Sequence, residues 1–92
     1  MSQLSIRRPH ALEQVEAHRR VSRVADKLVE RFGAVCRWEG EVLRIEHASV
    51  NGTVRVGANE IVVDARLGLA LSFLRGRAEQ EIARILDREL AA

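Results

Sequence analysis

The chain has 92 residues, of which 47% are hydrophobic and 30% are charged. This length supports one domain over residues 1–92 and excludes two independent cores, because each usually needs roughly 100 residues. The composition is that of a soluble globular protein and excludes a disordered polymer. Fifteen basic residues against thirteen acidic ones leave a net charge of only +2, which argues against a nucleic-acid partner. Because so small a domain buries a modest share of its surface, a homo-oligomer would add stability.

The cysteine content and the apolar segments bear on the compartment. A single cysteine, Cys36, cannot form an internal disulfide, and small secreted domains usually rely on several. No segment has the character of a signal peptide, and no window approaches the roughly 18 apolar residues of a membrane helix. We therefore expect a cytoplasmic protein without a transmembrane segment.

The first two elements differ in the period of their apolar residues. Residues 3–8 alternate, with Leu4 and Ile6 on one side, which predicts a short half-buried strand that ends at Pro9. The apolar residues then recur at steps of three and four, as on an amphipathic helix, and Gly33 is a typical helix stop. The predicted stripe of this helix is Leu12, Val15, Val21, Val24, Ala25, Leu28, Val29 and Phe32.

A β-hairpin is predicted around Gly40, within residues 34–47. With Glu39 and Gly40 as the two turn residues, Cys36 lies opposite Leu43 and one face of the hairpin is mostly apolar.

Two further strands continue the meander. Residues 48–52 form a turn whose register the sequence leaves open. The strand after it turns Val54 and Val56 inward, and residues 58–59 connect it to a strand over 60–67. That last strand alternates apolar and polar residues, which is typical of a sheet covered on one side and wet on the other.

A second helix is predicted after an apolar segment at residues 69–74. Its buried stripe is Ile82, Ala83, Ile85, Leu86 and Leu90. The order β-α-β-β-β-β-α predicts an α+β fold, with two helices packed on one face of an antiparallel sheet.

The candidates for catalysis and metal binding are few. A Cys36 nucleophile needs an imidazole base within about 3 Å. In the predicted hairpin His47 lies roughly 13 Å away, at about 3.4 Å per residue, so we interpret Cys36 as a small buried hydrophobe. His10, His18 and His47 lack the spacing of metal ligands, and His10 is placed to satisfy backbone amides near the start of the helix. We expect no catalytic residues, no cofactor and no metal.

A basic stripe is predicted on the first helix. Arg20, Arg23, Lys27 and Arg31 follow steps of three and four and should line up along one side. Such a stripe could attract the phosphate groups of lipid or nucleic acid. The alternative is a solvated helix face that neighbouring acidic residues partly neutralise.

The apolar segment before the second helix is a candidate contact surface. Leu69, Leu71, Phe73 and Leu74 are more large side chains than a short link easily buries, and exposed apolar patches mark contacts with partners. The alternatives are core packing between the sheet and the final helix, and a homodimer interface.

Five short segments are informative in combination. They are Arg8-Pro9-His10-Ala11-Leu12, Arg37-Trp38-Glu39-Gly40, Val50-Asn51-Gly52, Leu67-Gly68-Leu69 and Gly76-Arg77-Ala78-Glu79-Gln80-Glu81-Ile82. With them the chain resembles the polyhydroxyalkanoic acid system protein family, small bacterial proteins whose name implies association with genes of polyhydroxyalkanoate granules. The resemblance implies this setting, and it supplies no catalytic residues.

Two hypotheses about function follow. The first is a non-enzymatic accessory or regulatory protein of polyhydroxyalkanoate storage that contacts a protein or the granule surface through the contact surface and the basic stripe. The second is a small domain that binds or hydrolyses an acyl-type ligand in a cleft between the sheet and the C-terminal helix. Trp38, predicted to point inward, would line that cleft.

Overall fold

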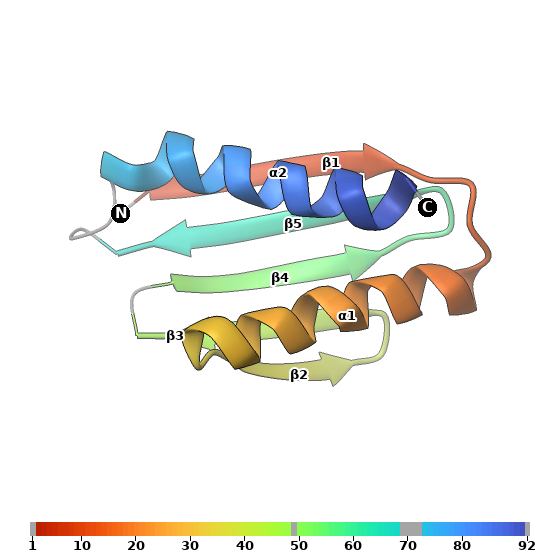
Figure 1. Ribbon diagram of the computed structural model, residues 1–92, viewed down its shortest axis with the longest axis horizontal. Helices are drawn as coiled ribbons and strands as arrows, with labels where there is room; N and C mark the ends of the chain where they lie inside the picture. Colours follow the sequence, from red (N-terminus) through yellow and green to blue (C-terminus); the bar gives the residue numbers. More distant parts are fainter. Residues whose placement is uncertain (1, 49, 69–72, 92) are drawn as a thin grey trace.

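The computed structural model describes residues 2–48, 50–68 and 73–91 (Figure 1). The elements in these residues are β1 (Ser2–Pro9), α1 (Gln14–Phe32), β2 (Val35–Glu39), β3 (Val42–His47), β4 (Val50–Val56), β5 (Glu60–Leu67) and α2 (Arg75–Ala91). The strands pair antiparallel in the order β1-β5-β4-β3-β2, which makes β1 and β2 the edges of the sheet. Both helices lie on the same face, so the predicted α+β order and layering are confirmed.

The two helices divide the covered face between them. In Figure 1, α2 runs along β1 and β5, whereas α1 runs in the opposite direction over β4, β3 and β2. The other face of the sheet carries no helix, and we call it the open face. Every second residue of each strand therefore points either into a helix-covered core or onto the open face.

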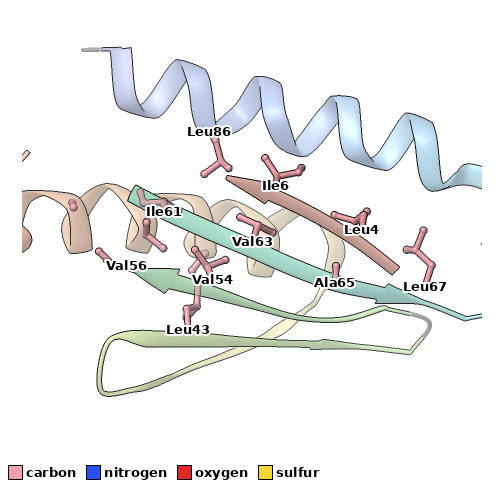
Figure 2. Packing of buried hydrophobic residues seen from close by; sticks show 13 residues of the cluster. Leu4, Ile6, Leu43, Val54, Val56, Ile61, Val63, Ala65, Leu67 and Leu86 are labelled. Carbon is pink, nitrogen blue, oxygen red and sulfur yellow. The ribbon is translucent and has the colours of Figure 1, made fainter. Parts of the chain in front are cut away.

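The core follows the predicted alternation closely. Its fully buried strand residues, most of which are labelled in Figure 2, are Leu4, Ile6, Leu43, Val54, Val56, Ile61, Val63, Ala65 and Leu67. The small side chains Ala17, Val21 and Ala25 of α1 and the single Leu86 of α2 close the core from above. Large apolar side chains thus come from the sheet, and small ones from α1 let that helix approach closely.

The first helix begins later and buries less than the sequence predicts. It starts at Gln14, and Gly33 ends it in the left-handed conformation (φ 67°), as predicted. Val15 is 73% exposed and Val29 47% exposed, so neither belongs to the core as predicted. At about 100° per residue, Val15 lies on the opposite side of the helix from Ala17, because the buried residues repeat every four positions from there.

The hairpin between β2 and β3 has a different register from the predicted one. Gly40 has a φ of 62° and is the only non-extended glycine of the turn, and Glu41 has a negative φ. A two-residue hairpin with positive φ at its first position needs glycine there, so the turn residues are Gly40 and Glu41. Cys36 therefore pairs with Ile45 rather than with Leu43. The slip is two residues, so every side chain keeps its predicted face.

The remaining strand connections agree with the sequence or complete it. The turn from β4 to β5 is centred on residues 58–59 as predicted, and the Gly57 N–H donates to the Glu60 carbonyl at 2.9 Å. His47 pairs with Val50, which fixes the register that the sequence left open and places Leu43 opposite Val54.

Candidate interaction surfaces

Cys36 lies beneath α1, in surroundings that suppress its reactivity. Its Sγ is 3.9 Å from the Ala25 carbonyl oxygen, and the side chain is half-buried. Burial raises the pKa of the thiol, and the nearby carboxylate of Asp26 raises it further. The corrected register places His47 two residues beyond the strand partner of Cys36 rather than four. A thiolate, which is the reactive form, is disfavoured at this position.

The histidines take part in local structure. The His10 Nε2 lies 2.9 Å from the Gly57 carbonyl oxygen, and its Nδ1 accepts the Leu12 N–H at 3.1 Å. This ring therefore carries its proton on Nε2 and joins the β1–α1 link to the β4–β5 turn, in line with its predicted role of satisfying amides. His18 stacks on Trp38 with ring centroids 3.7 Å apart. Within the described part of the chain, His, Cys, Asp and Glu side chains do not gather into a group that could hold a metal ion.

The basic stripe faces the end of α2. The Arg20 side chain is only 13% exposed; its Nε donates to Glu16 at 2.9 Å and its Nη1 donates to the Glu89 carbonyl oxygen at 2.7 Å. Lys27 lies 3.2 Å from the Glu89 carboxylate and Arg23 lies 3.9 Å from it. Guanidinium and ammonium groups at the last carbonyls of a helix also oppose its dipole. Three of the four stripe residues thus hold α2 against α1.

Sequence reasoning missed Glu89 as the partner of the stripe. It identified Glu16 as an i, i+4 partner of Arg20, and the Arg20 bond does lower the pKa of Glu16. A charge at the far end of the chain leaves no periodic signal on the first helix, since only the tertiary fold brings α2 beside α1. Arg31, the fourth stripe residue, is exposed in the last turn of α1.

The predicted contact surface is described in part. Leu69 and Leu71 lie outside the described residues, Phe73 is 81% exposed, and Leu74 is half-buried just before α2. Figure 1 shows that α1 ends, and β2 and α2 begin, at the same end of the molecule. Two further exposed apolar residues, Val29 and Val35, belong to these element ends. We call Val29, Val35 and Phe73 the apolar end.

The open face is polar and hollowed. A depression of about 780 Å³ extends across β1, β5, β4 and β3, and Arg44, Asp64 and Arg66 are among the residues that line it. Glu39 on the neighbouring strand accepts a hydrogen bond from Arg44 at 2.6 Å, which lowers the pKa of that carboxyl group. This depression is on the side of the sheet away from the predicted cleft.

The placement of Trp38 disagrees with the ligand-binding hypothesis. That hypothesis puts Trp38 in a cleft between the sheet and the C-terminal helix. Trp38 lies on β2, at the edge of the sheet farthest from β1, and packs beneath His18 of α1. The strands that α2 follows are at the other edge, so the indole cannot line a cleft beside that helix.

Neither α1 nor α2, the helices of the described ranges, is both long and apolar enough to cross a membrane.

Comparison with known proteins gives one match. Residues 4–90 match the model of the family described as "Putative polyhydroxyalkanoic acid system protein". No curated protein and no solved structure matches the chain.

Proposed function

Because the chain belongs to the polyhydroxyalkanoic acid system protein family, we propose that it is a non-enzymatic accessory or regulatory protein of polyhydroxyalkanoate storage. It works in the cytoplasm and acts by contact with the surface of the polymer granule. The observation that carries this proposal is the exposure of Phe73, at 81%, together with Val29 and Val35 at the same end of the molecule.

The chemistry of the apolar end suits a granule surface. A polyester granule presents apolar material to water, and burial of one large apolar side chain in such material contributes about 1.5–3 kcal/mol. Arg31 lies in the last turn of α1, beside the apolar end, and provides a cation for an anionic granule coat. Anchoring through a few side chains of this kind is weak and reversible, as a regulatory contact requires.

The non-enzymatic part of the proposal is supported by how the reactive side chains are used. The thiol of Cys36 is held in its neutral form by burial. His10 and His18 are committed to the Gly57 carbonyl and to the Trp38 ring. These groups stabilise the fold, and each would have to leave its contact to act as a base or nucleophile.

Co-sedimentation with isolated polyhydroxyalkanoate granules tests the proposal. Phe73→Asp should reduce the bound fraction several-fold, because a charge replaces the most exposed apolar ring. Val15→Asp is the matched control: this valine is 73% exposed, but it lies in the first turn of α1, roughly 21 Å from Val29 along the helix. Circular dichroism checks that both variants are folded.

Two results would count against the proposal. Equal granule binding by folded Phe73→Asp and by the wild type excludes the apolar end as the contact. Absence of wild-type binding to granules, with capture of a soluble protein that Phe73→Asp abolishes, moves the contact from the granule surface to a protein partner.

A further inference from the structure

The open face arranges its side chains in three rows across the sheet, as the strand register defines them. In the order β1, β5, β4, β3 and β2, the first row is Arg7, Val62, Arg55, Val42 and Glu39. The middle row is Ser5, Asp64, Thr53, Arg44 and Arg37. The third row is Gln3, Arg66, Asn51, Glu46 and Val35. β4 is therefore the middle column of the face.

Several charges of this face have no counter-charge in their own chain. Arg7 pairs with Glu60 at 2.8 Å, and Arg44 pairs with Glu39 at 2.6 Å. By contrast, among the residues that the structure describes, Asp64, Arg66 and Glu46 form no ion pair, and all three are exposed. The face thus holds unsatisfied charges of both signs, on opposite sides of β4.

We propose that a second copy of the chain covers the open face, sheet against sheet, about a two-fold axis that runs along β4. Such an axis keeps the rows and exchanges the columns, so that β5 of one copy faces β3 of the other and β1 faces β2. An interface of this kind is isologous, and each contact occurs twice.

The exchange of columns brings opposite charges together. Asp64 faces Arg44 of the second copy, and Arg66 faces Glu46. In the first row, Arg7 faces Glu39 of the second copy. The charges that lack partners within one chain therefore acquire them in the dimer, which fixes the register of the two sheets.

An apolar contact accompanies the ion pairs. Val62 faces Val42 of the second copy in the first row, and both valines are half-buried already by the long side chains around them. A single like-charge contact remains, because Arg55 lies on the axis and meets its own symmetry mate. Five strands spaced about 4.8 Å apart offer a face roughly 24 Å wide, which suits a weak, concentration-dependent dimer.

The other two-fold arrangement is disfavoured by the same charges. An axis across the strands through the middle row would keep the columns and exchange the outer rows. It would place Asp64 against Asp64, Arg44 against Arg44 and Arg37 against Arg37. Like charges in contact are repulsive, so the pattern selects the axis along β4.

Analytical ultracentrifugation of the full chain over a range of concentrations tests the proposal. We expect a reversible dimer that weakens in about 1 M salt, where the Debye length is roughly 3 Å. Asp64→Arg and Arg44→Asp should each weaken it by about tenfold at both symmetric contacts, or about a hundredfold in all. The double variant Asp64→Arg with Arg44→Asp should restore it, and Arg55→Thr should tighten it.

A cross-link tests the geometry itself. Asn51 faces its own symmetry mate across the axis, so Asn51→Cys in a Cys36→Ala background should be joined into a covalent dimer by a short bis-maleimide. A linker is needed because packed sheets lie about 10 Å apart. Gln3→Cys, on the same face and in the same row, lies far from its symmetry mate and should not react this way.

Three results would overturn the proposal. One is a chain that stays monomeric at the highest concentration. Another is a dimer that survives both single charge reversals, which places the interface elsewhere, for example at the apolar end. The third is a double reversal that fails to restore association although the variant is folded. Granule binding by Phe73→Asp is measured separately, so failure of this proposal leaves the proposed function standing.

Discussion

The two helices lie side by side on one sheet and are held there by different forces. α1 packs through Ala17, Val21 and Ala25, which are fully buried against the strands. α2 contributes one fully buried side chain, Leu86, which Figure 2 shows pointing toward the sheet near Ile6. The rest of its attachment is polar.

The polar attachments of α2 involve both of its ends. The Arg75 Nε donates to the Gln3 carbonyl of the edge strand β1 at 2.5 Å, and Asp87 pairs with Arg8 at 2.8 Å. Near the C-terminal end, Glu89 meets the basic stripe of α1. Burial of small apolar side chains is insensitive to salt and pH, whereas ion pairs depend on both. The comparison teaches that α2 is the helix whose docking solution conditions can change.

The largest expected effect is that of Leu86→Ala. Removal of the one buried anchor of α2 should cost about 2–5 kcal/mol of unfolding free energy, the usual range for a buried leucine. Urea unfolding measures this loss, and hydrogen exchange locates it. We expect amides of residues 75–91 to lose protection well before those of α1. Equal loss of protection in both helices would show that the two are not held differently.

A smaller effect is expected from Glu89→Gln. The side chain is 12% exposed and lies between Lys27 and Arg23. Those cations are about half exposed and can be hydrated, so loss of the carboxylate charge should cost only about 1 kcal/mol. The variant should also lose much of the salt dependence of stability. Asp87→Asn, which breaks the more exposed Arg8 pair, is the control; a larger loss from that substitution would contradict the assignment.

The smallest effect is expected for Glu16→Gln as a function of pH. The hydrogen bond from Arg20 is the main cause that lowers the pKa of Glu16 below its ordinary 4.5. A carboxyl group with a lowered folded pKa stabilises the fold above its unfolded pKa, and this contribution is lost as the pH falls through the folded value. Urea unfolding at about pH 6 and pH 3 should therefore show a smaller acid loss for the variant. Parallel curves for the variant and the wild type would refute the coupling.

Sequence was enough to predict the elements and their faces, because apolar periodicity is a local property. Gly33 stops α1 and residues 58–59 turn β4 into β5, as predicted from glycine conformation and short turn chemistry. The register at Gly40 was wrong because two neighbouring two-residue turns preserve the same faces. Only the sign of φ at the first turn residue separates them.

The candidate surfaces were predictable only where they depend on one element. The basic stripe is a property of α1 alone, and its alignment was read correctly. Its partner Glu89 lies on another helix, at the opposite end of the chain, and could not be inferred. The rows of the open face likewise depend on the register of five strands, so the opposition of Asp64 and Arg44 about β4 becomes visible only in the folded sheet.

The position of β1 has a consequence for the order of folding during synthesis. β1 leaves the ribosome first, yet its hydrogen-bonding neighbour is β5, from the far part of the chain. The strands β2 to β5 pair with their immediate successors and can assemble locally, whereas β1 must wait for the whole meander. A nascent chain therefore carries Leu4 and Ile6 without cover until residues 60–67 have emerged, and this interval is when a chaperone would have the most to do.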